Sequence, residues 1–162
     1  LTPNEFTYTS LISACAKAGE YDHARLIFDG MMRDGLTPNL YAHNAVLSAC
    51  KLGGRWQEAL ALLYEMRDRF PAHQLSGAYT CAMAACNVSG HFDVALRLFH
   101  EMQPTGVPTQ TTAYNAAILA CCRSGAFDLA LDLFHRMSPP PGAPADSPSP
   151  AAAAACVGGD MP

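Results

Sequence analysis

The sequence lacks long apolar runs, although half of its 162 residues are hydrophobic. A helix that crosses a bilayer needs roughly 18 or more consecutive residues that are apolar and uncharged. No stretch approaches that length, and the alanines at 151–155 are too few and too weakly apolar. We therefore expect no membrane span. No signal or transit peptide is visible at Leu1, and none is expected if the sequence is an internal piece of a longer protein.

Positive charge is scarce as well. The chain has 10 Lys and Arg against 14 Asp and Glu, which gives a net charge of −4. Proteins that hold nucleic acid mainly through its phosphates need an excess of basic residues. A nucleic-acid partner would therefore have to be recognised through its bases rather than by a basic surface.

Compact catalytic and metal-binding motifs are also missing. The sequence contains no Gly-rich phosphate loop, no H-E-x-x-H and no G-x-S-x-G. Four histidines without a common register are interpreted as surface residues: His23, His91, His100 and His135. The seven cysteines form no C-x-x-C pair with a matching second pair, which a zinc site of that type needs. We expect neither enzymatic activity nor a metal or other cofactor.

What the sequence does have is a pattern that recurs every 35 or 36 residues. Each copy opens with a ring-bearing residue and a small polar one, at Tyr8-Thr9, His43-Asn44, Tyr79-Thr80 and Tyr114-Asn115. A Cys follows, and four residues later a Gly, at Gly19, Gly54, Gly90 and Gly125. Because these four cysteines lie a whole copy apart, we expect small buried thiols in a reducing compartment. A period of this length is typical of stacked helical repeats.

Each copy has the pattern of two helices. In the first copy, four apolar residues spaced three and four apart fall on one helix face: Tyr8, Leu11, Ile12 and Cys15. Gly19 then offers a left-handed C-terminal cap. A second apolar face follows at Tyr21, Ala24, Ile27, Phe28 and Met31. The short break at the Gly predicts two antiparallel helices, and the second helix needs the next copy to cover its apolar face.

The copies divide the chain into an array and an unlike tail. Residues 1–4 repeat the Leu-Thr-Pro-Asn of 36–39 and are interpreted as the end of an upstream copy. The copies themselves are assigned to 5–39, 40–75, 76–110 and 111–138, the last of them incomplete. Residues 139–162 are rich in Pro and Ala, and we expect disorder there because they cannot bury enough apolar area to offset the cost of ordering. The predicted fold class is all-α, an α-solenoid of about four helix-turn-helix copies.

Four short motifs recur in register within the copies. They are T-Y-x-x-L-I, C-x-x-x-G, A-x-x-x-F-x-x-M and G-x-x-P-N, and the first copy has all four, from Thr7 to Asn39. This combination resembles the pentatricopeptide repeat family over about residues 1–138. The tetratricopeptide repeat fits less well, because it places a small residue where this chain has Ile12 and an Ala where it has Met31.

The resemblance implies a right-handed α-solenoid that binds single-stranded RNA, one base per copy, without a cofactor. It implies a monomer in a mitochondrion or chloroplast that acts in RNA processing, stabilisation or translation, with other RNA-processing proteins as further partners. A protein-binding scaffold stays the alternative, because stacked helix pairs also make concave surfaces for proteins. The acidic balance of the chain suits that alternative slightly better.

The resemblance also implies which residues read bases. In the family, the small polar residue near the start of a copy and the last residue of the copy select the base. The small polar residues here are Thr9, Asn44, Thr80 and Asn115. Thr9 with the closing Asn39 suggests adenine, whereas Asn44 and Asn115 suggest pyrimidines and Thr80 a purine. The closing residues Leu75 and Gln110 depart from the family pattern.

Stacking and phosphate contacts are implied at fewer positions. Phe6 and Tyr41 lie where the family sandwiches a base, whereas the residues near that place in the later copies, Gly77 and Thr112, supply little. Lys17 and Arg123, two residues before their Gly, are candidate phosphate contacts. Stacking contributes about 1–3 kcal/mol per base, while association costs about 4–15 kcal/mol. Four copies alone should therefore bind RNA weakly.

Overall fold

The computed structural model describes residues 3–137. Among these residues there are eight α-helices and no β-strand: α1 (Glu5–Ala18), α2 (Tyr21–Arg33), α3 (Leu40–Gly53), α4 (Trp56–Arg69), α5 (Ser76–Val88), α6 (Phe92–Met102), α7 (Thr111–Ser124) and α8 (Phe127–Met137). A short 3₁₀ turn, Ala72–Gln74, lies between α4 and α5. None of the described helices is long and apolar enough to cross a membrane. The tail at 139–162 and the start of segment 1–4 lie outside the described residues.

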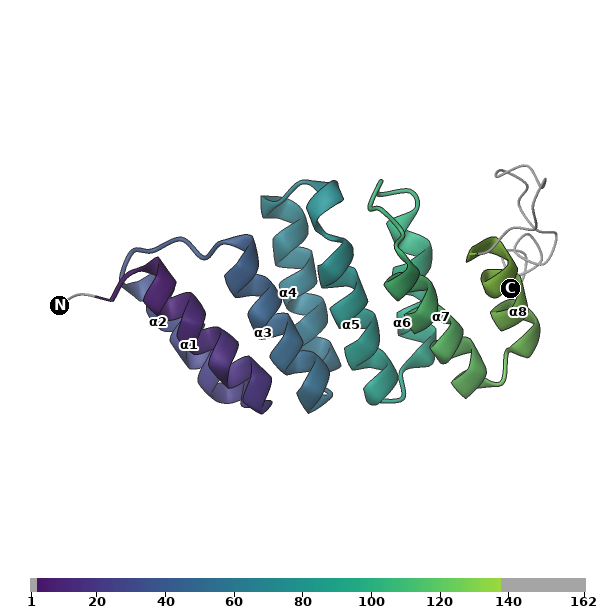
Figure 1. Ribbon diagram of the computed structural model, residues 1–162, viewed down its shortest axis with the longest axis horizontal. Helices are drawn as coiled ribbons and strands as arrows, with labels where there is room; N and C mark the ends of the chain where they lie inside the picture. The colour runs from purple at the N-terminus through teal and green to yellow at the C-terminus, as the bar shows by residue number, and fades with distance from the viewer. Residues whose placement is uncertain (1–2, 138–162) are drawn as a thin grey trace, which may run out of the picture.

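The helices form two layers (Figure 1). The odd-numbered helices α1, α3, α5 and α7, called the first helices below, pack side by side in one layer. The even-numbered helices, called the second helices, form the other layer. Each of α2, α4 and α6 packs against the first helix of its own copy and against the first helix of the next copy. This arrangement is the α-solenoid that the sequence predicts.

Local signals set the ends of the helices. Asn4 caps α1 by accepting a hydrogen bond from the Thr7 backbone N–H at 2.9 Å. Gly19 follows α1 with a φ of 75°, a left-handed conformation that side chains disfavour, and its N–H donates to the Ala16 carbonyl at 3.1 Å. The glycine cap predicted at this position is confirmed.

The core lies between the two layers and runs through all the copies. Phe28, Leu63 and Phe99 occupy the same place in successive copies, and all three are fully buried. The equivalent Phe134 is 51% exposed, because α8 packs mainly against α7 and no later helix among the described residues covers its other side. The apolar face of each second helix therefore needs the next copy to cover it, as the sequence predicts.

The buried face of α1 differs from the predicted one. Leu11, which the apolar spacing assigns to the core, is 49% exposed. The buried residues of α1 are instead Thr9, Ile12 and Ala16. Because α1 packs against both α2 and α3, the positions of these two neighbours decide which side of α1 is covered. The most apolar stripe of the helix does not decide it.

The repeated cysteines are small core residues. Cys50, Cys86 and Cys121 are buried free thiols, and Cys15 is partly buried. Burial raises the pKa of the Cys50 thiol to about 12 and that of the Cys86 thiol to about 11. Both thiols are therefore protonated at neutral pH and pack as small apolar groups.

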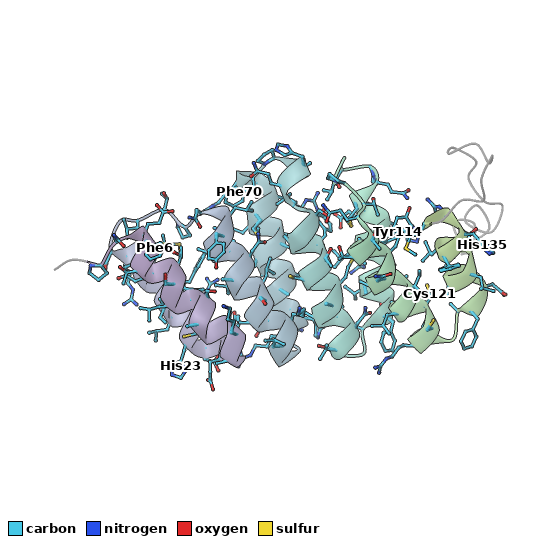
Figure 2. All side chains as sticks on the ribbon, in the orientation of Figure 1. Phe6, His23, Phe70, Tyr114, Cys121 and His135 are labelled. Atoms are coloured by element: carbon cyan, nitrogen blue, oxygen red, sulfur yellow. The ribbon has the colours of Figure 1, made fainter. Side chains whose placement is uncertain are left out.

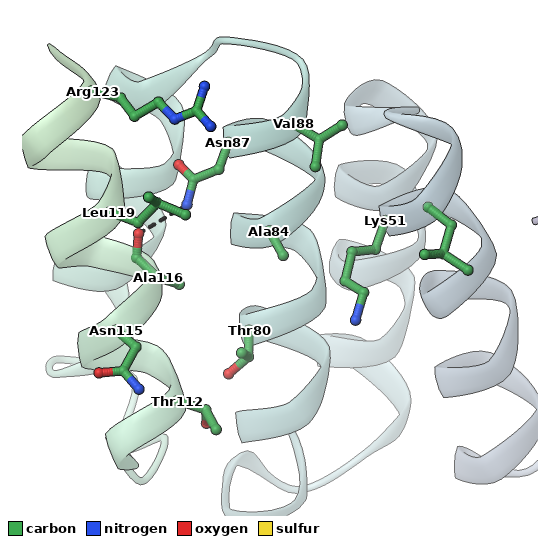
Figure 3. Close-up of a pocket in the computed structure, with 11 residues that line it drawn as sticks. Lys51, Thr80, Ala84, Asn87, Val88, Thr112, Asn115, Ala116, Leu119 and Arg123 are labelled. Carbon is green, nitrogen blue, oxygen red and sulfur yellow. Dashed lines mark hydrogen bonds between the residues drawn. The ribbon is translucent and has the colours of Figure 1, made fainter. Parts of the chain in front are cut away.

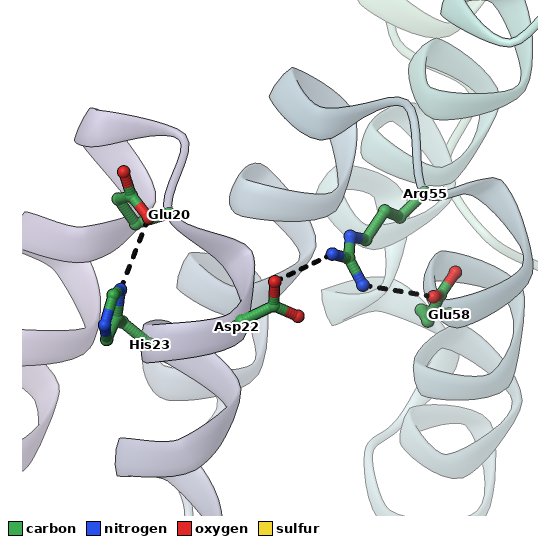
Figure 4. Close-up of polar contacts among 5 residues, drawn as sticks. All are labelled: Glu20, Asp22, His23, Arg55 and Glu58. Carbon is green, nitrogen blue, oxygen red and sulfur yellow. Dashed lines mark hydrogen bonds and ion pairs between the residues drawn. The ribbon is translucent and has the colours of Figure 1, made fainter.

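Polar contacts also join neighbouring copies at the surface. Arg55, just before α4, pairs with Asp22 of α2 at 2.9 Å and with Glu58 of α4 at 3.6 Å (Figure 4). The Arg55 guanidinium also lies over the ring of Tyr21, 4.6 Å from its centroid. Exposed ion pairs contribute little stability one by one. Here a single guanidinium contacts both α2 and α4, so it helps to align the two second helices.

Candidate functional site

Three recesses open between neighbouring first helices, and we call the surface that carries them the groove face. The first and second recesses lie between α1 and α3 and share Lys17 and Tyr41. The third recess lies between α5 and α7 and reaches the end of α3 at Lys51 and Leu52.

All nine residues that the sequence singles out line at least one recess. They are Phe6, Thr9, Lys17, Asn39 and Tyr41 in the first, Lys17, Tyr41 and Asn44 in the second, and Thr80, Asn115 and Arg123 in the third. Residues from four copies are thus gathered on one face of the array.

The two threonines present hydrogen-bond acceptors rather than free donors. The Thr9 hydroxyl donates to the carbonyls of Glu5 and Phe6 at 2.9 and 3.1 Å, and the residue is only 7% exposed. The Thr80 hydroxyl donates to the Ser76 carbonyl at 2.8 Å. A hydroxyl has one proton and two lone pairs, so each oxygen can still accept a hydrogen bond from a ligand in the recess.

The two asparagines at the equivalent positions differ in their surroundings. Asn44 is partly buried, and its Oδ1 has no hydrogen-bond partner among the described residues. A buried acceptor without a partner costs free energy, so a ligand that donates to it is favoured. Asn115 is exposed and presents its amide to the third recess (Figure 3).

Asn39 has both polar atoms of its amide in use. Its Oδ1 caps α3 by accepting from the Ala42 backbone N–H at 2.9 Å. Its Nδ2 donates to the carboxylate of Glu5 at the start of α1. The amide nitrogen has two N–H groups, so one of them is still available to a ligand while the other stays bonded to Glu5.

Two aromatic side chains stand at the edge of the first recess. Phe6 of α1 is 77% exposed (Figure 2), and Tyr41 of α3 is 59% exposed. The Tyr41 hydroxyl donates to the Ser13 hydroxyl of α1 at 3.3 Å, which restrains the ring across the gap between the two helices. Large exposed rings on a recess edge offer flat faces on which a planar ligand can stack.

Charge is divided between the two layers. The four first helices, all of which the structure describes, carry Lys17, Lys51 and Arg123 but only one acidic residue, Glu5. The second helices carry nine acidic residues and six arginines. Within the described helices, the negative balance therefore lies on the second helices, and the groove face is mildly basic. The total charge can be read from the sequence, but its division between the two surfaces cannot.

The repeat pattern of the sequence does not mark one polar residue of the third recess. Asn87 of α5 is 7% exposed and donates from Nδ2 to the Ala116 carbonyl of α7 at 2.9 Å. The other copies have Ala16, Lys51 and Cys122 at this position. Because the residue does not recur, no repeated signal marks it.

Comparison with solved structures places this fold among known ones. A crystal structure of the pentatricopeptide repeat protein PPR10 in complex with an 18-nt psaJ RNA element matches with a TM-score of 0.73 and 29% sequence identity, over 84% of this chain and 20% of that chain. A second such complex, with three cysteines of PPR10 changed to serine, has the same values. PPR10 from maize matches with a TM-score of 0.64 at 29% identity, over 84% of this chain and 19% of that chain. The chain thus spans about a fifth of the length of these structures.

Sequence comparison gives the same assignment. No curated protein sequence matches the chain. The family model described as "Pentatricopeptide repeat domain" matches residues 1–55, and the model described as "PPR repeat" matches residues 77–103 and 112–138. These matches cover most of the helical array that the structure describes. The chain belongs to the pentatricopeptide repeat family.

Proposed function

We propose that the groove face binds single-stranded RNA and that each copy contacts one base. The observation that carries the proposal is the gathering of nine candidate residues, from four copies, into three recesses on one face. The cations of the first helices lie on the same face. The likeness to PPR10 in complex with an RNA element supports the same ligand.

The recesses suit unpaired bases for physical reasons. An unpaired base can stack on Phe6 or Tyr41, which are exposed at the edge of the first recess. The oxygens of Thr9 and Thr80 can accept from base amino groups, while an Asn amide can both donate and accept. We assign adenine to Thr9 with Asn39, pyrimidines to Asn44 and Asn115, and a purine to Thr80.

The proposed mechanism is occupancy rather than chemistry. A bound array would cover a stretch of transcript and so block an exonuclease, open a hairpin or present the RNA to a processing factor. Family membership supports an organellar transcript, in a mitochondrion or chloroplast, as the target.

Binding of short single-stranded RNA at low salt tests the proposal. Tyr41→Ala should weaken binding roughly fivefold or more, because stacking contributes about 1–3 kcal/mol per base. Tyr64→Ala is the matched control, since Tyr64 is also an exposed tyrosine but belongs to the second helix α4. If the chain binds no RNA at low salt, or if the two variants weaken binding equally, the groove face is not an RNA surface and a protein-binding scaffold becomes the better explanation.

A second experiment tests the assignment of bases to the first copy. Thr9→Asn with Asn39→Asp should shift the preference of that copy from adenine toward uracil. Both the parent and the variant should carry Glu5→Gln, because a carboxylate at position 39 would otherwise face Glu5. Asp is also a good helix N-cap, so α3 keeps its cap. An unchanged base preference would contradict the assignment of adenine to Thr9 and Asn39. It would not contradict the proposal that the groove face binds RNA.

A further inference from the structure

The third recess has two distinct polar ends (Figure 3). Thr80 and Asn115 lie at one end, and Asn87 and Arg123 lie at the other. Thr80 and Asn87 are seven residues apart on α5, which corresponds to about 10 Å along a helix. The recess has a volume of about 590 Å³. The bases proposed for Thr80 and for Asn115 therefore do not reach Asn87, and a different part of a bound RNA would lie there.

Asn87 has a free acceptor in a fixed orientation. The side chain is 7% exposed, and its Nδ2 donates to the Ala116 carbonyl at 2.9 Å. Because a carbonyl only accepts, this bond settles which amide atom is the nitrogen and directs Oδ1 away from Ala116, toward the Arg123 end of the recess (Figure 3). Oδ1 has no hydrogen-bond partner among the described residues. The amide is thus held ready to accept a hydrogen bond.

The surroundings of Asn87 limit what can donate to it. Val88 and Leu119, which are 65% and 47% exposed, provide apolar surface in the recess, and Lys51 and Arg123 provide positive charge. The cations suit a phosphate, but a phosphate oxygen cannot donate to Oδ1. In a nucleotide the ribose lies between base and phosphate, and its 2′-hydroxyl is both a donor and an acceptor.

We propose that Asn87 Oδ1 accepts a hydrogen bond from the 2′-hydroxyl of a ribose whose carbon face packs on Leu119, which lies beside Asn87 (Figure 3). The proposal rests on RNA binding by the groove face. It makes the third recess a place where the chain distinguishes RNA from DNA, independently of base identity. Oδ1 is closed off from solvent in the structure, so a side chain that lines the recess has to move before the ligand reaches it.

Backbone analogues of one oligonucleotide test this contact. The same short sequence is titrated in its ribose, 2′-fluoro and 2′-deoxy forms, with fluorescence anisotropy at low salt as the readout. A 2′-fluoro group keeps a ribose-like sugar pucker but cannot donate a hydrogen bond. The chain should bind the ribose form about threefold to tenfold more tightly than the 2′-fluoro form, which is the size of one hydrogen bond.

Three variants separate this role from a structural one. Asn87→Ala should make binding of the ribose and 2′-fluoro forms equal. Asn87→Asp keeps an acceptor but loses the bond to Ala116. It should still prefer the ribose form over the 2′-fluoro form by the same factor, even if it binds RNA more weakly. Asn115→Ala, at the other end of the recess, should leave the ratio unchanged.

The outcomes also separate the two proposals. Equal affinity of the unmodified chain for the ribose and 2′-fluoro forms overturns the ribose contact and leaves RNA binding intact. A preference for the ribose form that persists in a folded Asn87→Ala variant has the same consequence. An oligonucleotide that contains adenosine is also compared with one that contains purine riboside, which lacks the amino group. If the chain binds the adenosine form more tightly and Asn87→Ala removes that difference, Asn87 contacts a base and the ribose contact is wrong. Failure of every form to bind overturns the proposed function as well.

Discussion

Asn39 and Glu5 are joined by a hydrogen bond from the Asn39 amide nitrogen to the Glu5 carboxylate, across 34 residues of sequence. Asn39 is the residue proposed to select a base together with Thr9. Glu5 is the only acidic residue among the first helices that the structure describes. The carboxylate thus takes one of the two donors of the Asn39 amide and places a negative charge beside the first recess, which Asn39 lines.

Glu5→Ala should therefore tighten RNA binding. Removal of the carboxylate frees the Asn39 amide and removes repulsion of phosphate, so we expect an increase of about threefold to tenfold at low salt, which shrinks as salt is raised. The measurement is an RNA titration at several salt concentrations. Glu58→Ala is the control, because Glu58 lies on the second helix α4 and its loss should leave affinity nearly unchanged. Weaker binding by Glu5→Ala would show that Glu5 supports the site instead of competing with RNA.

The cations of the groove face should be visible in the salt dependence of binding. Lys17→Ala and Arg123→Ala each remove an exposed cation from a recess. Each should lower the slope of log affinity against log salt by about 0.7, the value for one phosphate contact on a single strand. Arg97→Ala, which removes an exposed cation from α6, should leave the slope unchanged. Equal slopes for all three variants would mean that Lys17 and Arg123 do not contact phosphate.

The repeat pattern explains why the fold was predictable and some details were not. Helices, glycine caps and buried second-helix positions recur in register, so each copy supports the assignment of the others. The exposure of Leu11 depends on where α2 and α3 lie against α1, which the sequence of α1 does not contain.

Contacts between copies were the least predictable part of the candidate site. The Asn39–Glu5 and Asn87–Ala116 bonds join residues 34 and 29 positions apart, and neither recurs in the other copies. Recurrence marks Thr9, Asn44, Thr80 and Asn115, but it does not mark Asn87, which occurs in one copy only. The bond between Asn39 and Glu5 has no signal in the sequence either.

Phe99 and Phe134 offer a matched test of packing between copies. They occupy equivalent positions, but Phe99 is fully buried, with its ring centroid 5.1 Å from that of Tyr114 in the next copy, whereas Phe134 is 51% exposed. Phe99→Ala should lower the free energy of unfolding by about 3–5 kcal/mol. Phe134→Ala should cost less than about 1 kcal/mol, because much of the side chain already contacts solvent. Urea denaturation measures both, and similar losses would contradict the packing described for α8.

His43 should make the array sensitive to acid. It replaces the tyrosine of the other copies and is fully buried, with its ring against Phe28 at 5.0 Å and Phe70 at 5.3 Å between centroids. The Asn39 carbonyl accepts a hydrogen bond from Nδ1–H at 2.9 Å, so the neutral ring carries its free lone pair on Nε2. The Glu65 carboxylate lies 3.9 Å from Nε2. Burial nevertheless dominates and lowers the pKa of His43 below its ordinary value of 6.5, against the opposing effects of the Asn39 bond and Glu65.

The sign of the stability change follows from this lowered pKa. Between the folded pKa and 6.5, the unfolded chain binds a proton that the folded chain does not, so stability is fully present above pH 6.5 and falls as the pH drops below it. The urea midpoint should therefore decrease from about pH 7.5 to about pH 5, and His43→Tyr should remove part of that decrease. His73→Tyr, at an exposed position, should leave it in place. A decrease of equal size with and without His43 would mean that other groups cause the acid sensitivity, since only the buried imidazole has to lose its proton in order to pack between Phe28 and Phe70.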